Sequence, residues 1–112
     1  MKDTLVVEPN TFKLYELNVP EQVRNWRIWG KFLAEGGSGN DIEAYVFDAE
    51  GIANWKNYHG YRRYYESGKV TAGSFDLPLN PGKYFLVFSN RMSIRSNKVA
   101  RLETTTEFDE SK

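Results

Sequence analysis

The chain has 112 residues and a mass of 13.0 kDa, which fits a single domain over residues 1–112 with an ordered core at about 4–108. Hydrophobic residues make up 40% of it and aromatic residues 15%, which excludes an intrinsically disordered chain. The 15 basic and 15 acidic residues exclude the overall positive field of a nucleic-acid-binding protein, and the lack of cysteine excludes thiol catalysis, disulfides and thiolate metal sites.

The sequence predicts neither a membrane span nor a signal peptide. No apolar run approaches the ~20 residues of a membrane-spanning helix. The first ten residues carry an acid at Asp3 and lack a long apolar stretch. The compartment is left open, because Met1 is compatible with a natural start and with the boundary of a cloned fragment.

Period-two alternation of apolar side chains predicts strands along most of the chain. The predicted strands cover residues 4–7, 12–19, 25–36, 41–47, 61–66, 74–79, 84–88 and 97–108. In the third of these, Trp26 and Ile28 alternate with Arg27, which is typical of a half-buried strand. The seventh (YFLVF) is apolar on both faces, so we expect it to be central in its sheet.

Turn residues separate these strands. A flexible connection is predicted at 35–40 (EGGSGN) and a short turn at 67–69 (SGK). The run 79–82 (LNPG) predicts a type II turn with Pro81 and Gly82 at its two central positions. About eight short strands at this spacing predict an all-β fold, an antiparallel β-sandwich.

One segment has weak helical character. Ile52, Trp55 and Tyr58 follow one another at intervals of three residues. We therefore predict one short helical turn near residues 50–58, and we expect it to cover an open end of the sandwich.

The residue types do not favour catalysis. His59 is the only histidine, and no G-x-S-x-G turn supplies a nucleophile, so we interpret it as structural or solvent-exposed. Asp41, Glu43 and Asp48 are hard oxygen ligands that leave a calcium site open, although their spacing fits no EF-hand. We expect no enzyme, no catalytic residue, no cofactor and no metal.

The segment 55–65 is the strongest candidate for a binding surface, because exposed Trp, Tyr and Arg are typical of interface hot spots. The candidate residues are Trp55, Tyr58, Tyr61, Arg62 and Arg63, together with Arg91 and Arg95 from the last predicted hairpin loop. Two other interpretations stay open. Trp55, Tyr58 and Tyr61 are suited to stacking on sugar rings, or Trp55 simply closes the sandwich.

A second surface feature is a run without acids between Asp76 and Glu103. Its five cations are Lys83, Arg91, Arg95, Lys98 and Arg101. They are compatible with contact to an anionic lipid surface, but we favour a solvated stretch balanced by the acids that follow.

Residues 82–93 (GKYFLVFSNRMS) and 96–99 (SNKV) resemble the closing strands of GOLD domains, which occur in p24 cargo receptors and Sec14-like proteins. The matching positions include Gly82, Tyr84, Phe88 and Asn90. The resemblance implies a GOLD-like or jelly-roll-like sandwich that acts by protein–protein contact without an enzymatic step. The predicted function is therefore a non-catalytic interaction module, with a carbohydrate-binding module, a peripheral anionic-lipid-binding module or a structural spacer as alternatives.

Overall fold

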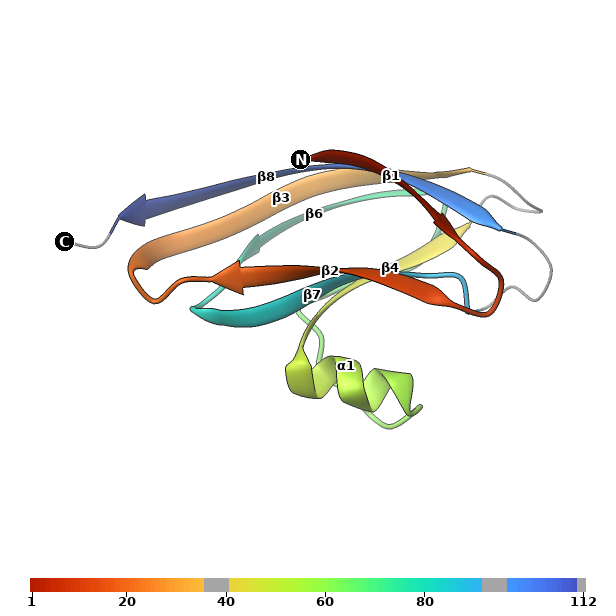
Figure 1. Ribbon diagram of the computed structural model, residues 1–112, viewed down its shortest axis with the longest axis horizontal. Coiled ribbons are helices and arrows are strands. Elements are labelled where there is room, and N and C mark those ends of the chain that lie inside the picture. Colours follow the sequence, from red (N-terminus) through yellow and green to blue (C-terminus); the bar gives the residue numbers. More distant parts are fainter. Residues whose placement is uncertain (36–40, 92–96, 111–112) are drawn as a thin grey trace.

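The computed structural model describes residues 1–35, 41–91 and 97–110, and it contains two antiparallel sheets of four strands each (Figure 1). The first sheet has the order β1 (Lys2–Val7), β8 (Lys98–Glu110), β3 (Val23–Glu35), β6 (Ala72–Pro78). The second has the order β2 (Phe12–Val19), β7 (Gly82–Ser89), β4 (Ile42–Asp48), β5 (Tyr65–Val70). A helix, α1 (Ala49–Lys56), lies between β4 and β5 in the chain.

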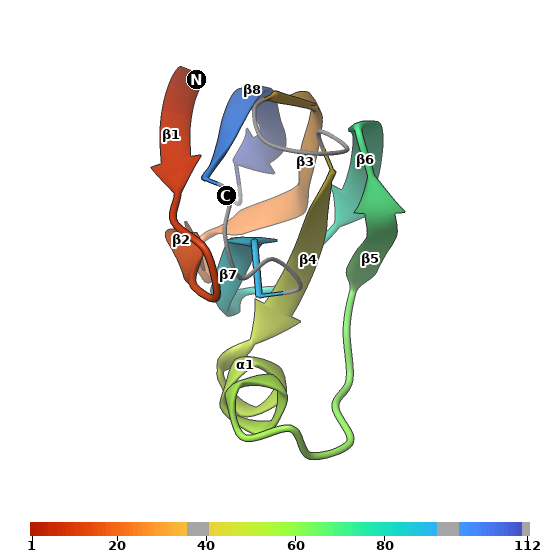
Figure 2. The same cartoon turned by 90° about the vertical axis from the view of Figure 1, so that its right-hand side faces the viewer.

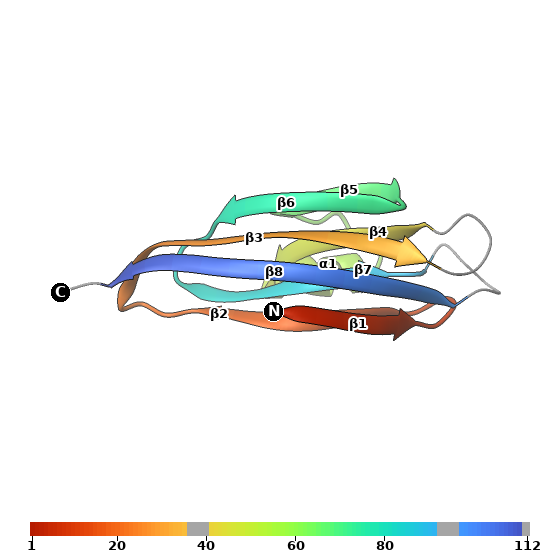
Figure 3. The same ribbon diagram turned by 90° about the horizontal axis from the view of Figure 1, so that it is seen from above.

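The chain changes sheet at every strand connection except that between β4 and β5. Figure 3 shows the first sheet from above, with β1, β8, β3 and β6 side by side. This strand order and the two-layer packing are those of an eight-stranded jelly roll. The predicted fold class, an all-β antiparallel sandwich, is confirmed. The alternation in β3 is confirmed too, since Trp26 and Ile28 are buried and Arg27 is exposed.

The helix covers the outer face of the second sheet rather than an open end of the sandwich, so its predicted place was wrong (Figure 2). Val46 and its even-numbered neighbours in β4 face the main core between the sheets. The outward Tyr45 and Phe47 are also buried, because Ile52 and Trp55 of α1 pack on them. The predicted half-buried strand is therefore buried on both faces over most of its length.

The fifth strand lies later in the chain than predicted. Residues 61–64 form no strand, and β5 spans Tyr65–Val70, so the predicted turn at 67–69 lies inside it. There the pairing with β4 shifts register, and Gly68 has a φ of +70°, which is favourable only for glycine. The hydroxyl of Ser67 accepts from the backbone amide of Ala44 at 2.8 Å. A β-bulge with glycine thus replaces the turn.

Asn90 links the end of β7 to the first sheet through a hydrogen bond. Its side-chain amide donates to the carbonyl of Val7 at 2.9 Å, and its backbone amide donates to the carbonyl of Thr11 at 2.8 Å. Arg91 follows at once, so these bonds fix where its side chain emerges. The core of the predicted flexible connection, residues 36–40, lies outside the described residues.

Candidate functional site

The helix begins where β4 ends because Asp48 caps it. The carboxylate of Asp48 accepts from the backbone amide of Gly51 at 2.7 Å. Glu50 in the first turn and Lys56 in the last both complement the helix dipole. Gly51 is buried, and a Cβ there would lie 2.5 Å from the carbonyl oxygen of Arg62. The helix therefore packs directly on the backbone of the segment that follows it.

Tyr58 is held out into solvent at the carboxyl end of α1. Its backbone amide donates to the carbonyl of Trp55 at 3.2 Å, and that of His59 donates to the carbonyl of Asn54 at 2.9 Å. Tyr58 has a φ of +58°, a left-handed conformation that is unfavourable for a bulky residue. Its side chain is nevertheless 82% exposed. The fold thus fixes an aromatic residue on the surface without burying it.

Arg91 contacts two aromatic rings. Its guanidinium carbon is 4.1 Å from the ring centroid of Tyr58 and 4.3 Å from that of Trp55. One Nη donates to the carbonyl of Trp55 at 3.2 Å. These contacts join the end of β7 to the end of α1 and hold the guanidinium at the carboxyl end of the helix.

Trp55 is buried, as expected, but it packs on the outer face of the second sheet and does not close the sandwich. Its ring centroid lies 5.0 Å from that of Phe12 and 5.2 Å from that of Tyr45. Tyr61 is half-buried, and its ring meets Phe47 at a centroid distance of 5.5 Å. The three rings of the proposed sugar platform therefore do not form one exposed surface, and of the three only Tyr58 is largely exposed.

A hollow of about 360 Å³ opens between the end of α1 and the outer face of the second sheet. It is lined by Glu43, Tyr45, Trp55, Tyr58, His59, Tyr61, Ser89 and Arg91. Four of its eight lining residues are therefore aromatic, and it also holds one carboxylate and one guanidinium.

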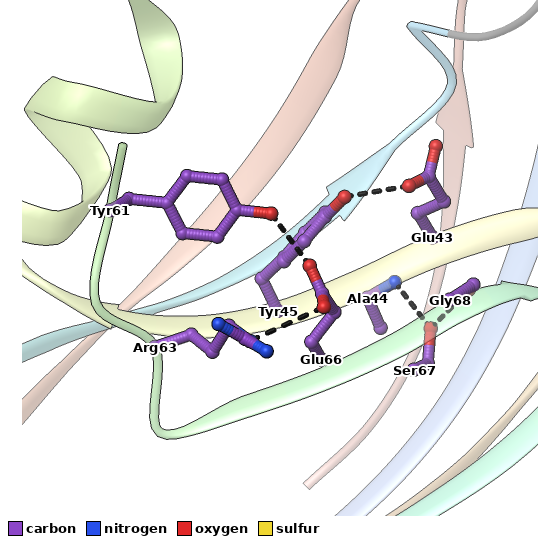
Figure 4. Close-up of polar contacts among 8 residues, drawn as sticks. All are labelled: Glu43, Ala44, Tyr45, Tyr61, Arg63, Glu66, Ser67 and Gly68. Atoms are coloured by element: carbon purple, nitrogen blue, oxygen red, sulfur yellow. Dashed lines mark hydrogen bonds and ion pairs between the residues drawn. The ribbon is translucent and has the colours of Figure 1, made fainter. Parts of the chain in front are cut away.

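Two tyrosine hydroxyls in this hollow donate to carboxylates (Figure 4). Tyr45 donates to Glu43 at 2.6 Å, and Tyr61 donates to Glu66 at 2.6 Å. Burial, reinforced by the bond to Glu43, raises the pKa of Tyr45 well above its usual value of 10.0. Burial and the bond to Glu66 raise the pKa of Tyr61 as well. Both hydroxyls are therefore protonated donors at neutral pH.

Arg62 and Arg63 differ in whether a carboxylate balances their charge. Arg63 forms an ion pair with Glu66, with Nε and a carboxylate oxygen 3.2 Å apart, so its charge is balanced. Arg62 is exposed and lines a second hollow, of about 340 Å³, that shares Tyr61 with the first. Arg95 lies outside the described residues. We call the set of Lys56, Tyr58, His59, Arg62 and Arg91 the Tyr58 surface.

The fold does not bring together the described cations of the predicted lipid-binding run. Lys83 pairs with Glu16 at 2.9 Å and Arg101 pairs with Glu35 at 3.4 Å, while Lys98 is buried. The described part of the predicted lipid-binding run is therefore dispersed over the molecule.

The acids weighed as calcium ligands are also apart, because Asp41 and Asp48 flank opposite ends of β4. Glu43 accepts from Tyr45 instead. Within residues 1–35, 41–91 and 97–110, no three metal-ligating side chains gather.

The contribution of the sheet to this site was not predicted from the sequence. Glu43 and Ser89 line the hollow from β4 and β7, and Phe12 of β2 supports Trp55. Alternation alone places Glu43 and Tyr45 on one face of a strand. Only the position of the helix shows which end of that strand face remains uncovered.

Comparison with known proteins adds no relative: no protein-family model matches the chain, and no curated protein matches it. Among the described residues, the single helix has eight residues, far fewer than a bilayer crossing needs.

Proposed function

We propose that this chain is a non-catalytic protein–protein interaction module whose contact region is the Tyr58 surface. The observation that carries the proposal is the conformation of Tyr58, a non-glycine residue with positive φ whose ring is 82% exposed. The left-handed conformation closes the end of α1, where the amides of Tyr58 and His59 bond to helical carbonyls, and glycine is the usual residue at such a position. A bulky residue costs roughly 1–2 kcal/mol there, and burial of this ring does not offset that cost. An exposed aromatic ring in place of glycine supports a side chain prearranged for a ligand.

The composition of the surface supports a protein partner. Tyr and Arg are enriched among residues that dominate binding energy, and rigid aromatic side chains lose little conformational entropy on association. Tyr58 is held by its stack on Arg91, and Arg62 lies close along the chain. A glycan-binding role is less well supported, because the Trp55 indole is covered by Phe12 and Tyr45.

We further propose that the sandwich is related to GOLD domains. The support is the run from Gly82 to Asn90 (GKYFLVFSN), which forms β7 and its end, followed by β8 after residues 92–96. Tyr84 and Phe88 of this run face the main core, so the resemblance concerns residues that build the fold. It bears on architecture and leaves the binding surface to be tested separately.

The test is affinity capture from a lysate of cells that express the protein, quantified by mass spectrometry. Wild type is compared with Tyr58→Ala/Arg62→Glu and with a matched control, Tyr64→Ala/Arg24→Glu. Tyr64 and Arg24 are also exposed, and neither lines the hollow beside Tyr58. We expect one or more proteins to be retained by wild type and by the control but lost from the Tyr58 variant. Equal retention by all three folded proteins would remove the Tyr58 surface as the contact region.

A further inference from the structure

We propose that the partner of the Tyr58 surface presents an acidic peptide segment, and that a side-chain carboxylate of this segment binds the N–H donors of the Arg91 guanidinium that Trp55 does not engage. The inference rests on the proposed function and names the chemistry of the partner. It follows from the contacts of Arg91 and from the distribution of unpaired cations over the molecule.

The Arg91 guanidinium is held by two rings and one hydrogen bond. Its central carbon lies 4.3 Å from the ring centroid of Trp55 and 4.1 Å from that of Tyr58. One Nη donates to the Trp55 carbonyl. The remaining N–H donors of a guanidinium lie in one plane, and this geometry binds a carboxylate through two parallel hydrogen bonds.

Cations elsewhere on the molecule are mostly balanced. Within the described ranges, ion pairs within 4.0 Å are formed by seven cations: Lys2, Arg27, Lys31, Arg63, Lys69, Lys83 and Arg101. Among the described side chains that are not buried, the cations without a carboxylate at this distance are Lys13, Arg24, Lys56, Arg62 and Arg91. Of these five, Arg91 contacts the Tyr58 ring, and Lys56 and Arg62 lie two and four residues from Tyr58 in the chain. Positive charge without a carboxylate beside the exposed ring favours an acidic partner.

The acids in and next to the hollow beside Arg91 are engaged or balanced, whereas Glu50 lines the second hollow together with Arg62. Glu43 in the hollow accepts from the Tyr45 hydroxyl and is the ladder partner of Lys69. Glu66 accepts from Tyr61 and pairs with Arg63, while Asp48 caps the helix. These contacts reduce the repulsion that an incoming carboxylate would meet, and they leave Arg91 as the charged group with open donors in the hollow.

The exposed ring of Tyr58 defines the rest of the ligand. An apolar or aromatic side chain next to the acidic residue of the partner covers the ring face that Arg91 does not touch. The preferred segment therefore combines one carboxylate with an adjacent apolar residue, in contrast to a uniformly charged polymer.

The probe is a phage-displayed library of random heptapeptides, selected on wild type and counter-selected on Tyr58→Ala/Arg62→Glu. Enriched peptides are synthesised with their Asp or Glu and with the matching Asn or Gln. Binding to 15N-labelled wild type is followed through the side-chain Nε–H signal of Arg91, which needs no variant. Arg91→Lys keeps the positive charge but removes the planar set of guanidinium N–H donors. Arg24→Lys is its matched control.

We expect the selected peptides to share an acidic residue at a fixed position and to shift the Arg91 Nε–H signal. Amide replacement or Arg91→Lys should weaken binding by about ten- to a hundredfold, as loss of charge-assisted hydrogen bonds does, while Arg24→Lys should have no effect. Peptides that depend on Tyr58 but not on an acid or on Arg91 would overturn the inference and leave the proposed function standing. A library that yields nothing specific to wild type would overturn both.

Sulfated heparin fragments and phosphatidylserine vesicles are run in parallel. An Arg91 signal that responds to either of these anions, with no response to the selected peptides, would overturn the peptide assignment.

Discussion

The indole of Trp55 meets the ring of Phe12 edge-on, with ring centroids 5.0 Å apart and an interplanar angle of 76°. This contact joins the helix to an edge strand of the second sheet, so α1 is fixed across the sheet from β4 to β2. It also explains why the tryptophan in an aromatic and basic segment serves the fold while its neighbour Tyr58 faces solvent.

We predict that Trp55→Ala lowers the free energy of unfolding by about 3–5 kcal/mol, the usual cost of truncating a buried large aromatic residue. Urea denaturation followed by circular dichroism measures it. Tyr58→Ala, which removes an exposed ring, should cost much less, mainly the stack on Arg91. Equal losses for the two variants would contradict the assignment of Trp55 to the core.

A second prediction concerns the backbone at Tyr58. Glycine accepts a φ of +58° without steric cost, whereas alanine does not. Tyr58→Gly should therefore unfold with a free energy about 1 kcal/mol higher than Tyr58→Ala, although both lose the ring. Both variants should also lose partner binding to the same extent. If Tyr58→Gly is the less stable of the two, the backbone conformation is not a source of strain.

The local sequence pattern was sufficient to predict most of the fold. The ranges predicted for β2 and β3 agree with the structure to within two residues at each end, because alternation and turn residues act over short distances. The fifth strand was misplaced because Ser67 and Gly68 read equally well as a turn and as a bulge. The difference depends on the Ala44 amide of another strand, which a local pattern does not contain.

The candidate site was predicted only in part. Tyr58, Arg62 and Arg91 could be selected by residue type, but the stacking of Arg91 joins residues 33 positions apart in the chain, from 58 to 91. The burial of Trp55 depends on the helix lying over the second sheet. The spacing of residues within one segment does not show which sheet that segment packs on.

The close approach of α1 to the following segment gives a third prediction. Alanine favours a helix over glycine by about 1 kcal/mol, so Gly51→Ala would stabilise an isolated helix. Here the added Cβ would lie 2.5 Å from the carbonyl oxygen of Arg62, and backbone must move to relieve that contact. We expect net destabilisation of at least about 1 kcal/mol in urea denaturation, with chemical-shift changes at residues 58–62. Increased stability with unchanged shifts would contradict this packing.

The fourth prediction concerns alkaline pH. Burial, and then the bond to Glu43, raise the pKa of Tyr45 above its usual value of 10.0. The unfolded chain releases this proton near pH 10 while the folded protein retains it, so the stabilisation is complete below pH 10 and is lost as the pH rises further. Tyr45→Phe removes the proton from both states. Between pH 10 and 11 the wild type should lose up to about 1.4 kcal/mol more per pH unit than the variant.

Urea midpoints measured from pH 8 to 11 test this difference. A residual slope is expected in Tyr45→Phe, since burial also raises the pKa of Tyr15 and Tyr65. Tyr58→Phe, a change on the exposed ring, is the matched control and should keep the wild-type slope. If Tyr45→Phe follows the wild-type curve in parallel, the Tyr45 hydroxyl is not held in its protonated form by the contacts under the helix. The hollow beside Arg91 would then lack the neutral donor that engages Glu43.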